Sequence, residues 1–293
     1  MGICTKPTAV GLSMHTILPY PQIHGHRGCR GLLPENTLPA FRRAVEIGVE
    51  VIELDVVISA DEQVVVSHEP WMSATICRQP DGRPILPAEQ TRHNLYSLSY
   101  ADIRAYDCGL TQHPGFPSQQ PQPAAKPLLR EVVSELDKLA WTLGRPAVRY
   151  SVEIKSSPAY EPGFQPPPAR FLELVLAELQ TTGILGRTTL LCFDTRVLRL
   201  AYEQLPEMPL CLLVEDTRPL HMHLAELGFQ PHIYGPDFRL LTPELAASLR
   251  TLGIGLVPWT VNEPADLRRM LQLHPTGITT DYPDRLMALR SAV

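Results

Sequence analysis

The sequence predicts an α/β protein of the (β/α)8 barrel class, in which each of eight strands is followed by a helix. Short apolar runs typical of buried strands alternate roughly eight times with amphipathic helix patterns. Proline stands at the start of several of these helices, where it suits the first turn. The length of 293 residues, of which 44% are hydrophobic, suits one such barrel or two ordinary domains.

The first repeat begins near His24. Apolar residues three and four apart predict an amphipathic helix over residues 37–48, with Asn36 as its N-cap and Gly48 at its end. The next strand covers residues 52–56. Because a helix separates this strand from the one before it, we expect the two strands to be parallel neighbours.

Glu53 and Asp55 stand two residues apart in this strand, so their side chains point to one face while the apolar residues point to the other. Two carboxylates on one face repel each other unless a positive charge lies between them. A divalent cation with oxygen ligands is the simplest such charge. The pair alone leaves open the alternative of an exposed edge strand with solvated acids.

Two histidines and an arginine flank this strand. His26 is followed by Arg27 and by Gly28, which frees the backbone to turn closely around a ligand. His68 ends the apolar run 64–66, which places it at the carboxyl end of a strand. A single histidine there is usually structural, but two histidines beside an acid pair and an arginine indicate that all these groups meet at one rim.

The order and spacing of these residues resemble the signature of the glycerophosphodiester phosphodiesterase (GDPD) family. The motifs are His26-Arg27-Gly28, Pro34-Glu35-Asn36-Thr37, Ala40-Phe41, Ile52-Glu53-Leu54-Asp55-Val56 and Val66-Ser67-His68. The resemblance covers about residues 23–289. It implies a (β/α)8 barrel that hydrolyses glycerophosphodiesters to sn-glycerol 3-phosphate and an alcohol, with one bound divalent metal ion, Mg²⁺ or Ca²⁺.

Proline-rich sequence interrupts the repeats at about residues 69–126, after the strand hairpin. Only residues 99–106 look helical there, so we expect a small loop-rich inserted cap rather than a barrel unit. Alternation then resumes, with strands predicted at 148–155, 188–193, 209–214, 232–234, 255–260 and 277–280, and helices at 128–143, 169–182 and near Val197, Leu220, Pro243, Pro264 and Pro283. The predicted organisation is one barrel domain over residues 22–293, preceded by an N-terminal extension, 1–21.

In such barrels the chemistry lies at the carboxyl ends of the strands. The strand at 148–155 ends with Glu153 and Lys155 on one face. Glu153 would complete an acid triad with Glu53 and Asp55, and Lys155 would supply a point charge for a phosphate. A surface ion pair explains this spacing about as well, but the match to the family's third metal-ligand strand favours the site.

Four later residues carry further expectations. Phe193 and Trp259 are predicted to contact the substrate, with Trp259 as a wall for the glycerol or the leaving alcohol, although core packing is the alternative for both. Cys192 stands where many relatives have serine, and we expect it to tune the pocket. Asp281 is interpreted as a cap of the final helix. Glu69 replaces the aspartate usual in relatives.

The composition excludes several classes of partner. The net charge of −5 gives no indication of a nucleic-acid or acidic-membrane surface, so local cations must meet a phosphodiester. Residues 1–21 carry only Lys6 as a cation and several prolines, which argues against a signal peptide or a membrane span. We therefore expect a cytoplasmic protein without stable membrane insertion. The six scattered cysteines are predicted to be free thiols, and a homo-oligomer is left open.

The predicted mechanism combines these groups around a small-molecule glycerophosphodiester. The acid triad would hold the metal ion, His26 and His68 would act as general acid and base, and Arg27 and Lys155 would offset the phosphate charge. Two alternatives are kept. One is a lysophospholipase D, with the insertion shaping an acyl-binding groove, and the other is a non-catalytic phosphodiester-binding barrel.

Overall fold

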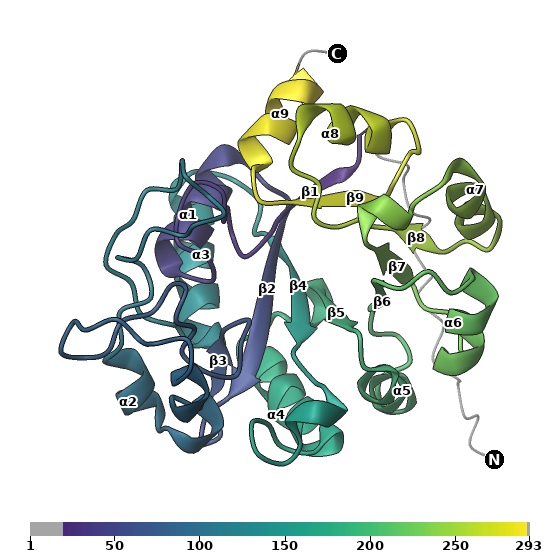
Figure 1. Ribbon diagram of the computed structural model, residues 1–293. Helices are drawn as coiled ribbons and strands as arrows, with labels where there is room; N and C mark the ends of the chain where they lie inside the picture. Colours follow the sequence, from purple (N-terminus) through teal and green to yellow (C-terminus); the bar gives the residue numbers. More distant parts are fainter. Residues whose placement is uncertain (1–19, 292–293) are drawn as a thin grey trace, which may run out of the picture.

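The computed structural model describes residues 20–291, which form a nearly closed barrel of parallel strands with helices on its outside (Figure 1). The hydrogen-bonded strand order is β8-β7-β6-β5-β4-β2-β1-β9. These strands are β1 (Gln22–Gly25), β2 (Val51–Ile58), β4 (Arg149–Ile154), β5 (Thr188–Cys192), β6 (Leu210–Val214), β7 (Ile233–Pro236), β8 (Gly255–Leu256) and β9 (Gly277–Thr280). The predicted barrel class is confirmed.

The barrel closes between β9 and the segment around β8. The strand expected over residues 255–260 is only two residues long, because Pro258 has no N–H to donate to a neighbour. The backbone N–H of Thr276 nevertheless donates to the carbonyl of Leu256 (2.8 Å), and that of Thr279 donates to the carbonyl of Pro258 (3.0 Å). These two bonds bring the last strand, and the residues after it, beside the rest of the ring.

The first helix shows how local sequence sets the element boundaries. Helix α1 (Leu38–Ile47) ends at Gly48, which adopts a left-handed conformation with φ 104°. The prediction of Asn36 as the N-cap is wrong, because Thr37 caps the helix and its Oγ1 accepts from the N–H of Ala40 (3.5 Å). Asn36 instead turns its amide towards the acid pair and donates to Asp55 Oδ2 (2.9 Å).

The remaining helices lie where the periodicity predicts them. They are α3 (Leu129–Thr142), α4 (Pro168–Thr181), α5 (Thr195–Gln204), α6 (Leu220–Leu227), α7 (Pro243–Thr251), α8 (Pro264–Leu271) and α9 (Pro283–Ser291). Short 3-10 turns precede β5 and follow β4 and β7, at η4 (Leu185–Arg187), η3 (Pro158–Tyr160) and η5 (Phe238–Leu240). Proline starts α4, α7, α8 and α9, because its missing N–H costs nothing in a first turn.

The main apolar core lies between the outer face of the strands and the helices. Ile52 and Leu54 of β2 are fully buried in it, together with Phe41 of α1 and Leu136 of α3. Since side chains alternate along a strand, this packing turns the acidic residues of β2 towards the barrel interior. The core therefore determines which face of β2 carries the chemistry.

Residues 69–126 form a loop-rich segment beside β3 (Val64–Val66), which pairs antiparallel with β2. This segment contains η1 (Gln90–Arg92), η2 (Leu95–Ser97) and α2 (Tyr100–Arg104), which is shorter than the helix expected at 99–106. Its buried apolar residues, such as Met72, Leu95 and Ile103, form one cluster with Val57 of β2 and Val65 of β3. The segment is therefore packed onto the barrel through these strands, while its Trp71 lines the cavity described below.

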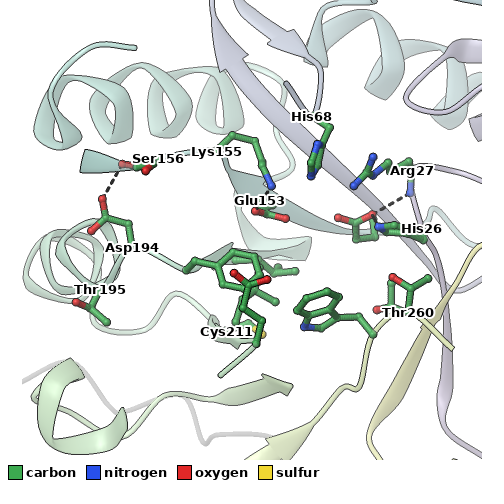
Figure 2. Close-up of a pocket in the computed structure, with 18 of the residues that line it drawn as sticks. His26, Arg27, His68, Glu153, Lys155, Ser156, Asp194, Thr195, Cys211 and Thr260 are labelled. Carbon is green, nitrogen blue, oxygen red and sulfur yellow. Dashed lines mark hydrogen bonds and ion pairs between the residues drawn. The ribbon is translucent and has the colours of Figure 1, made fainter. Parts of the chain in front are cut away.

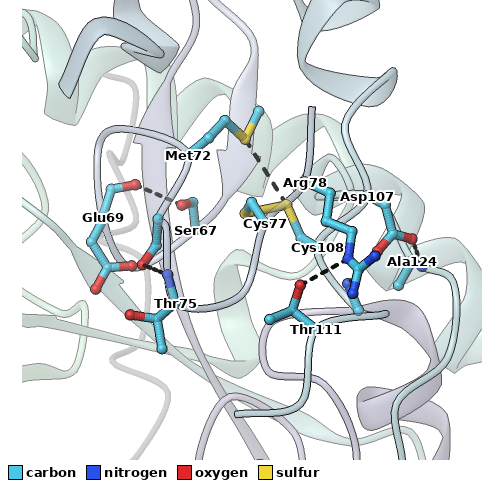
Figure 3. Close-up of a disulfide and its surroundings, with 12 residues drawn as sticks. Ser67, Glu69, Met72, Thr75, Cys77, Arg78, Asp107, Cys108, Thr111 and Ala124 are labelled. Carbon is cyan, nitrogen blue, oxygen red and sulfur yellow. Dashed lines mark hydrogen bonds between the residues drawn. A yellow bond between two sulfur atoms is a disulfide. The ribbon is translucent and has the colours of Figure 1, made fainter. Parts of the chain in front are cut away.

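The expectation of free thiols is wrong for two of the six cysteines. Cys77 and Cys108 form a disulfide inside the 69–126 segment (Figure 3), and sequence spacing gave no sign of it because the pairing depends on how the segment folds back. Cys29, Cys192 and Cys211 are free and buried. Cys4 lies outside the described residues.

No helix in residues 20–291 is long and apolar enough to cross a membrane. Disulfides are less common in reducing compartments, so the cytoplasmic location stays a prediction. Most of the expected extension 1–21 falls outside the described part of the chain.

Candidate active site

A cavity of about 980 Å³ opens at the carboxyl ends of the strands (Figure 2). Its wall contains most of the residues singled out in the sequence, namely His26, Arg27, Glu53, His68, Glu153, Lys155, Phe193 and Trp259. Asp55 lies immediately behind this wall and is almost fully buried. The structure therefore brings the predicted site residues together.

The acid triad comes from two neighbouring strands. Asp55 of β2 is paired with Glu153 of β4 in the sheet register. Glu53 lies two residues before Asp55 on β2, so its side chain points to the same, inner face. One ligand oxygen from each of the three carboxylates lies within 4.8 Å of the others, and all three residues are buried. The alternative of an exposed edge strand is wrong, since β2 lies between β1 and β4 and is buried along its whole length.

The electrostatics of the triad require positive charge. Burial raises the pKa of Glu53, and the neighbouring Asp55 carboxylate raises it further. Burial also raises the pKa of Glu153, although the Lys155 ammonium opposes that rise. Burial would raise the pKa of Asp55 as well, but Arg27, His68 and Lys155 outweigh it and hold that pKa below its usual range. Glu53 is thus the carboxylate that most lacks a cationic partner.

The donor set fits a divalent cation. Asp55 Oδ1 is buried and accepts no hydrogen bond from the described residues. Among the described residues, Arg27 and Lys155 are the arginine and lysine within 4.0 Å of the triad carboxylates, and both are shared, Arg27 with Glu35 and Lys155 between Asp55 and Glu153. A divalent ion would offset the negative charge that remains. Three carboxylate ligands suit Mg²⁺ and Ca²⁺ alike.

His26 follows β1 and is held by the last strand of the barrel. Its Nδ1 donates to Asp281 Oδ1 at 2.6 Å, and its Nε2 lies 3.9 Å from Glu53 Oε2. Asn262 donates to the second oxygen of Asp281 (2.7 Å). Asp281, expected only to cap α9, is therefore the residue that orients His26. The sequence signal for this role was its position at the end of β9, next to β1.

His68 follows β3 and lies between Lys155 and Arg27 at the cavity wall (Figure 2). Its Nδ1 donates to Glu69 Oε1 at 2.9 Å, and 31% of its side chain is exposed. Each histidine thus has Nδ1 engaged by a carboxylate, which leaves Nε2 as the ring nitrogen available to the cavity.

Arg27 and Lys155 are both fixed by acidic neighbours. Arg27 adopts a left-handed backbone with φ 48°, so that its N–H donates to Glu53 Oε2 (2.8 Å) while its Nε lies 3.2 Å from Asp55 Oδ2. Its Nη1 donates to Glu35 (2.7 Å), whose role the sequence motif did not reveal. Lys155 Nζ lies 2.7 Å from Glu153 Oε1. These contacts aim two cations at the acid triad.

The opposite wall of the cavity is apolar. Phe193 and Trp259 meet edge to face with centroids 5.6 Å apart, and both line the cavity beside Leu191 and Leu213. The indole N–H of Trp259 donates to the carbonyl of Gly235 (2.7 Å), which fixes the ring at the rim. Both rings are therefore partly exposed at the cavity wall and are not buried in the core, which was the alternative for each.

The expectation that Cys192 tunes the pocket is wrong. Its side chain is fully buried in the main core and its thiol donates to the carbonyl of Ile154 (3.1 Å), because alternation along β5 turns Leu191 and Phe193 inward instead. Cys211 of β6 lines the cavity in its place. His24 is buried beside Ser151 and does not line the cavity.

Fold and site together define a class, the (β/α)8-barrel enzymes whose acidic and basic groups meet at the carboxyl ends of the strands. A family model described as the glycerophosphoryl diester phosphodiesterase family matches residues 26–285. The chain belongs to this family of phosphoric diester hydrolases.

Individual relatives and solved structures are similar to this chain over at least 90% of its length. The glycerophosphodiester phosphodiesterase of Caldanaerobacter subterraneus is 27% identical, over 90% of this chain and 95% of that protein. A crystal structure from Silicibacter pomeroyi DSS-3, assigned as a glycerophosphoryl diester phosphodiesterase, has a TM-score of 0.83 at 31% identity and covers 94% of this chain and 96% of that one. An Oleispira antarctica phosphodiesterase in complex with sn-glycerol-3-phosphate shares the fold, with a TM-score of 0.73 at 18% identity over 93% and 97% of the two chains.

Proposed function

We propose that the protein hydrolyses glycerophosphodiesters to sn-glycerol 3-phosphate and an alcohol, with one divalent cation and with His26 and His68 as general acid and base. The observation that carries this proposal is the pairing of each histidine with a carboxylate through Nδ1, at 2.6 Å for His26 and 2.9 Å for His68. The two rings flank an acid triad in one cavity.

The chain's own cations bind and orient the phosphodiester. Arg27 and Lys155 lie at the triad and offset the charge that builds on phosphorus. A Mg²⁺ or Ca²⁺ ion held by Glu53, Asp55 and Glu153 would supply Lewis acidity at a phosphate oxygen.

Proton transfer is assigned to the two free ring nitrogens. The base histidine starts neutral, and its Nε2 accepts the proton of the nucleophile; the acid histidine starts as an imidazolium, and its Nε2 donates a proton to the leaving alkoxide, so that the two exchange protonation states. Water as nucleophile gives glycerol 3-phosphate directly, whereas attack by the neighbouring glycerol hydroxyl gives a cyclic phosphate that water then opens. Asp281 and Glu69 keep each Nδ1 protonated, so that each Nε2 can make this exchange.

The rings of Phe193 and Trp259 form an apolar wall that suits the carbon face of a glycerol unit. The product sn-glycerol-3-phosphate in the Oleispira phosphodiesterase supports this substrate class.

A lysophospholipase D activity is the second candidate, because the same wall continues through Leu191, Leu213 and Val257 and could meet an acyl chain. Most apolar residues of the 69–126 segment pack against β2 and β3, and of that segment Trp71 is the apolar residue that such a chain would meet at the cavity wall. An acylated glycerophosphocholine that is cleaved faster than the deacylated one would favour this candidate.

The test is release of glycerol 3-phosphate from glycerophosphocholine by native protein, metal-stripped protein and the His26→Ala variant. We expect activity that needs both the metal and His26, and full activity in the control His221→Ala, whose side chain is exposed on α6. No release by native protein supplied with Mg²⁺ or Ca²⁺, while the substrate still binds, would support the non-catalytic barrel instead.

A further inference from the structure

The 69–126 segment reaches back to the loop at residues 29–33, between the first two sequence motifs of the site. The side chain of Gln119 is only 4% exposed, and its amide NH₂ donates to the carbonyls of Arg30 (2.7 Å) and Leu33 (3.2 Å). Gln119 lies 89 and 86 positions from these two residues in the chain. Both donors of one buried amide therefore bind the backbone of this loop.

Neighbouring residues of the inserted segment contact the same loop. The backbone N–H of Gln120 donates to the carbonyl of Leu32 (2.9 Å). The Arg30 guanidinium lies over the ring of Phe116, with 4.8 Å between its Cζ atom and the ring centroid. The segment therefore holds both the backbone of the loop and the side chain of Arg30.

Arg30 connects this loop to Arg27 through a shared carboxylate. Arg30 Nε lies 2.5 Å from Glu35 Oε2, and Arg27 Nη1 donates to Glu35 Oε1 at 2.7 Å. Arg27 Nε in turn lies 3.2 Å from Asp55 Oδ2. Because Glu35 is buried between the two arginines, a displaced Arg30 would also displace the carboxylate that holds Arg27 at the acid triad.

The base of the loop is fixed without the inserted segment. The N–H of Asn36 donates to the carbonyl of Arg27 (3.1 Å), and the N–H of Gly31 donates to the carbonyl of Asp281 (2.9 Å). These bonds keep the loop closed and attach it to the end of β9. They do not involve the carbonyls that Gln119 binds, so loss of its amide should displace the outer part of the loop without unfolding the site.

We propose that Gln119 is a positioning residue for Arg27. Its amide fixes the 29–33 loop and so places Arg30 against Glu35. Glu35 in turn directs the Arg27 guanidinium at the acid triad. The phosphate-binding role of Arg27 in this inference rests on the proposed function.

The first test needs no substrate. In protein labelled with ¹⁵N-arginine, the Nε–H signal of Arg27, assigned with an Arg27→Lys variant, reports the position of the guanidinium. Gln119→Met keeps the length of the side chain but loses both donors, and it should shift or broaden this signal. Gln120→Met makes the same change in an exposed side chain, keeps the backbone bond to Leu32 and should leave the signal unchanged.

An Arg27 signal that is identical in Gln119→Met and native protein would overturn the proposal. Gln119→Ala, which leaves room for water at the two carbonyls, serves if Gln119→Met does not fold.

The second test is a double-mutant cycle on glycerophosphocholine hydrolysis. Gln119→Met should lower kcat/KM on the order of tenfold, whereas Gln120→Met should keep the native value. If Gln119 acts through Arg27, Gln119→Met adds no further loss to the Arg27→Lys variant. Losses that multiply would refute the proposal. Native protein without turnover would refute the proposed function, while the Arg27 signal still decides the role of Gln119.

Discussion

Replacing Asp281 with asparagine tests whether a residue from the last strand controls His26 at the first. The two are 255 positions apart, yet Asp281 Oδ1 accepts from His26 Nδ1 at 2.6 Å. Asparagine keeps the size of the side chain and loses its charge. Asn262 already donates to the second oxygen of Asp281 (2.7 Å), so an amide at position 281 would have to turn its NH₂ towards either Asn262 or His26.

The size of the effect follows from the bond that is lost. A hydrogen bond to a charged group contributes about 1.5–3 kcal/mol, and about 1.36 kcal/mol is a factor of ten in rate, so kcat should fall roughly 10- to 150-fold. An NH₂ group facing His26 would also donate to Nδ1 and so favour the tautomer with its proton on Nε2, where the base needs a free lone pair. The full contribution of acid–base catalysis, about 10²- to 10⁴-fold, is the upper bound.

The assay is kcat for glycerophosphocholine at saturating metal ion. Asp284→Asn is the matched control, because it makes the same change at an exposed position three residues later and should keep native kcat. Thermal unfolding of Asp281→Asn confirms that the barrel is intact. A folded Asp281→Asn variant with kcat within about twofold of native protein would refute the argument that Asp281 orients His26.

Three further predictions concern stability. Mg²⁺ or Ca²⁺ at one hundred times its Kd should stabilise the native protein by about 2.7 kcal/mol, measured as a higher Tm. The Glu53→Gln variant should lose this rise in Tm. An equal rise in native protein and variant would exclude the acid triad as the metal site. Replacing Cys77 and Cys108 with serine removes a cross-link between residues 31 positions apart. The free energy of unfolding, measured with denaturant, should fall by about 3.7 kcal/mol. Equal stability of variant and native protein would contradict a formed disulfide. Burial and the charge of Arg149 lower the pKa of His24 from 6.5 to about 3, so the unfolded chain binds its proton more readily. The stability due to neutral His24 is therefore complete above pH 6.5 and declines as the pH falls towards 3, by about 2 kcal/mol at pH 5; His24→Gln should flatten this decline, and an unchanged slope would contradict it.

Periodicity along the chain was enough to predict the barrel and to group the candidate site residues. The alternation of Glu53 and Asp55 in an apolar strand placed both carboxylates on one face, and the same period placed Glu153 and Lys155. Because parallel strands of a barrel end at one rim, residues at their carboxyl ends could be assigned to a common site without any coordinates.

How these groups are held depends on contacts between residues far apart in the chain. Asp281 reaches His26 because β9, the last strand, pairs with β1, the first. The cystine between Cys77 and Cys108 likewise depends on how the 69–126 segment folds. Strand and helix periodicity is a local property that the sequence carries directly. Contacts between residues far apart in the chain depend on closure and packing, which spacing along the chain does not encode.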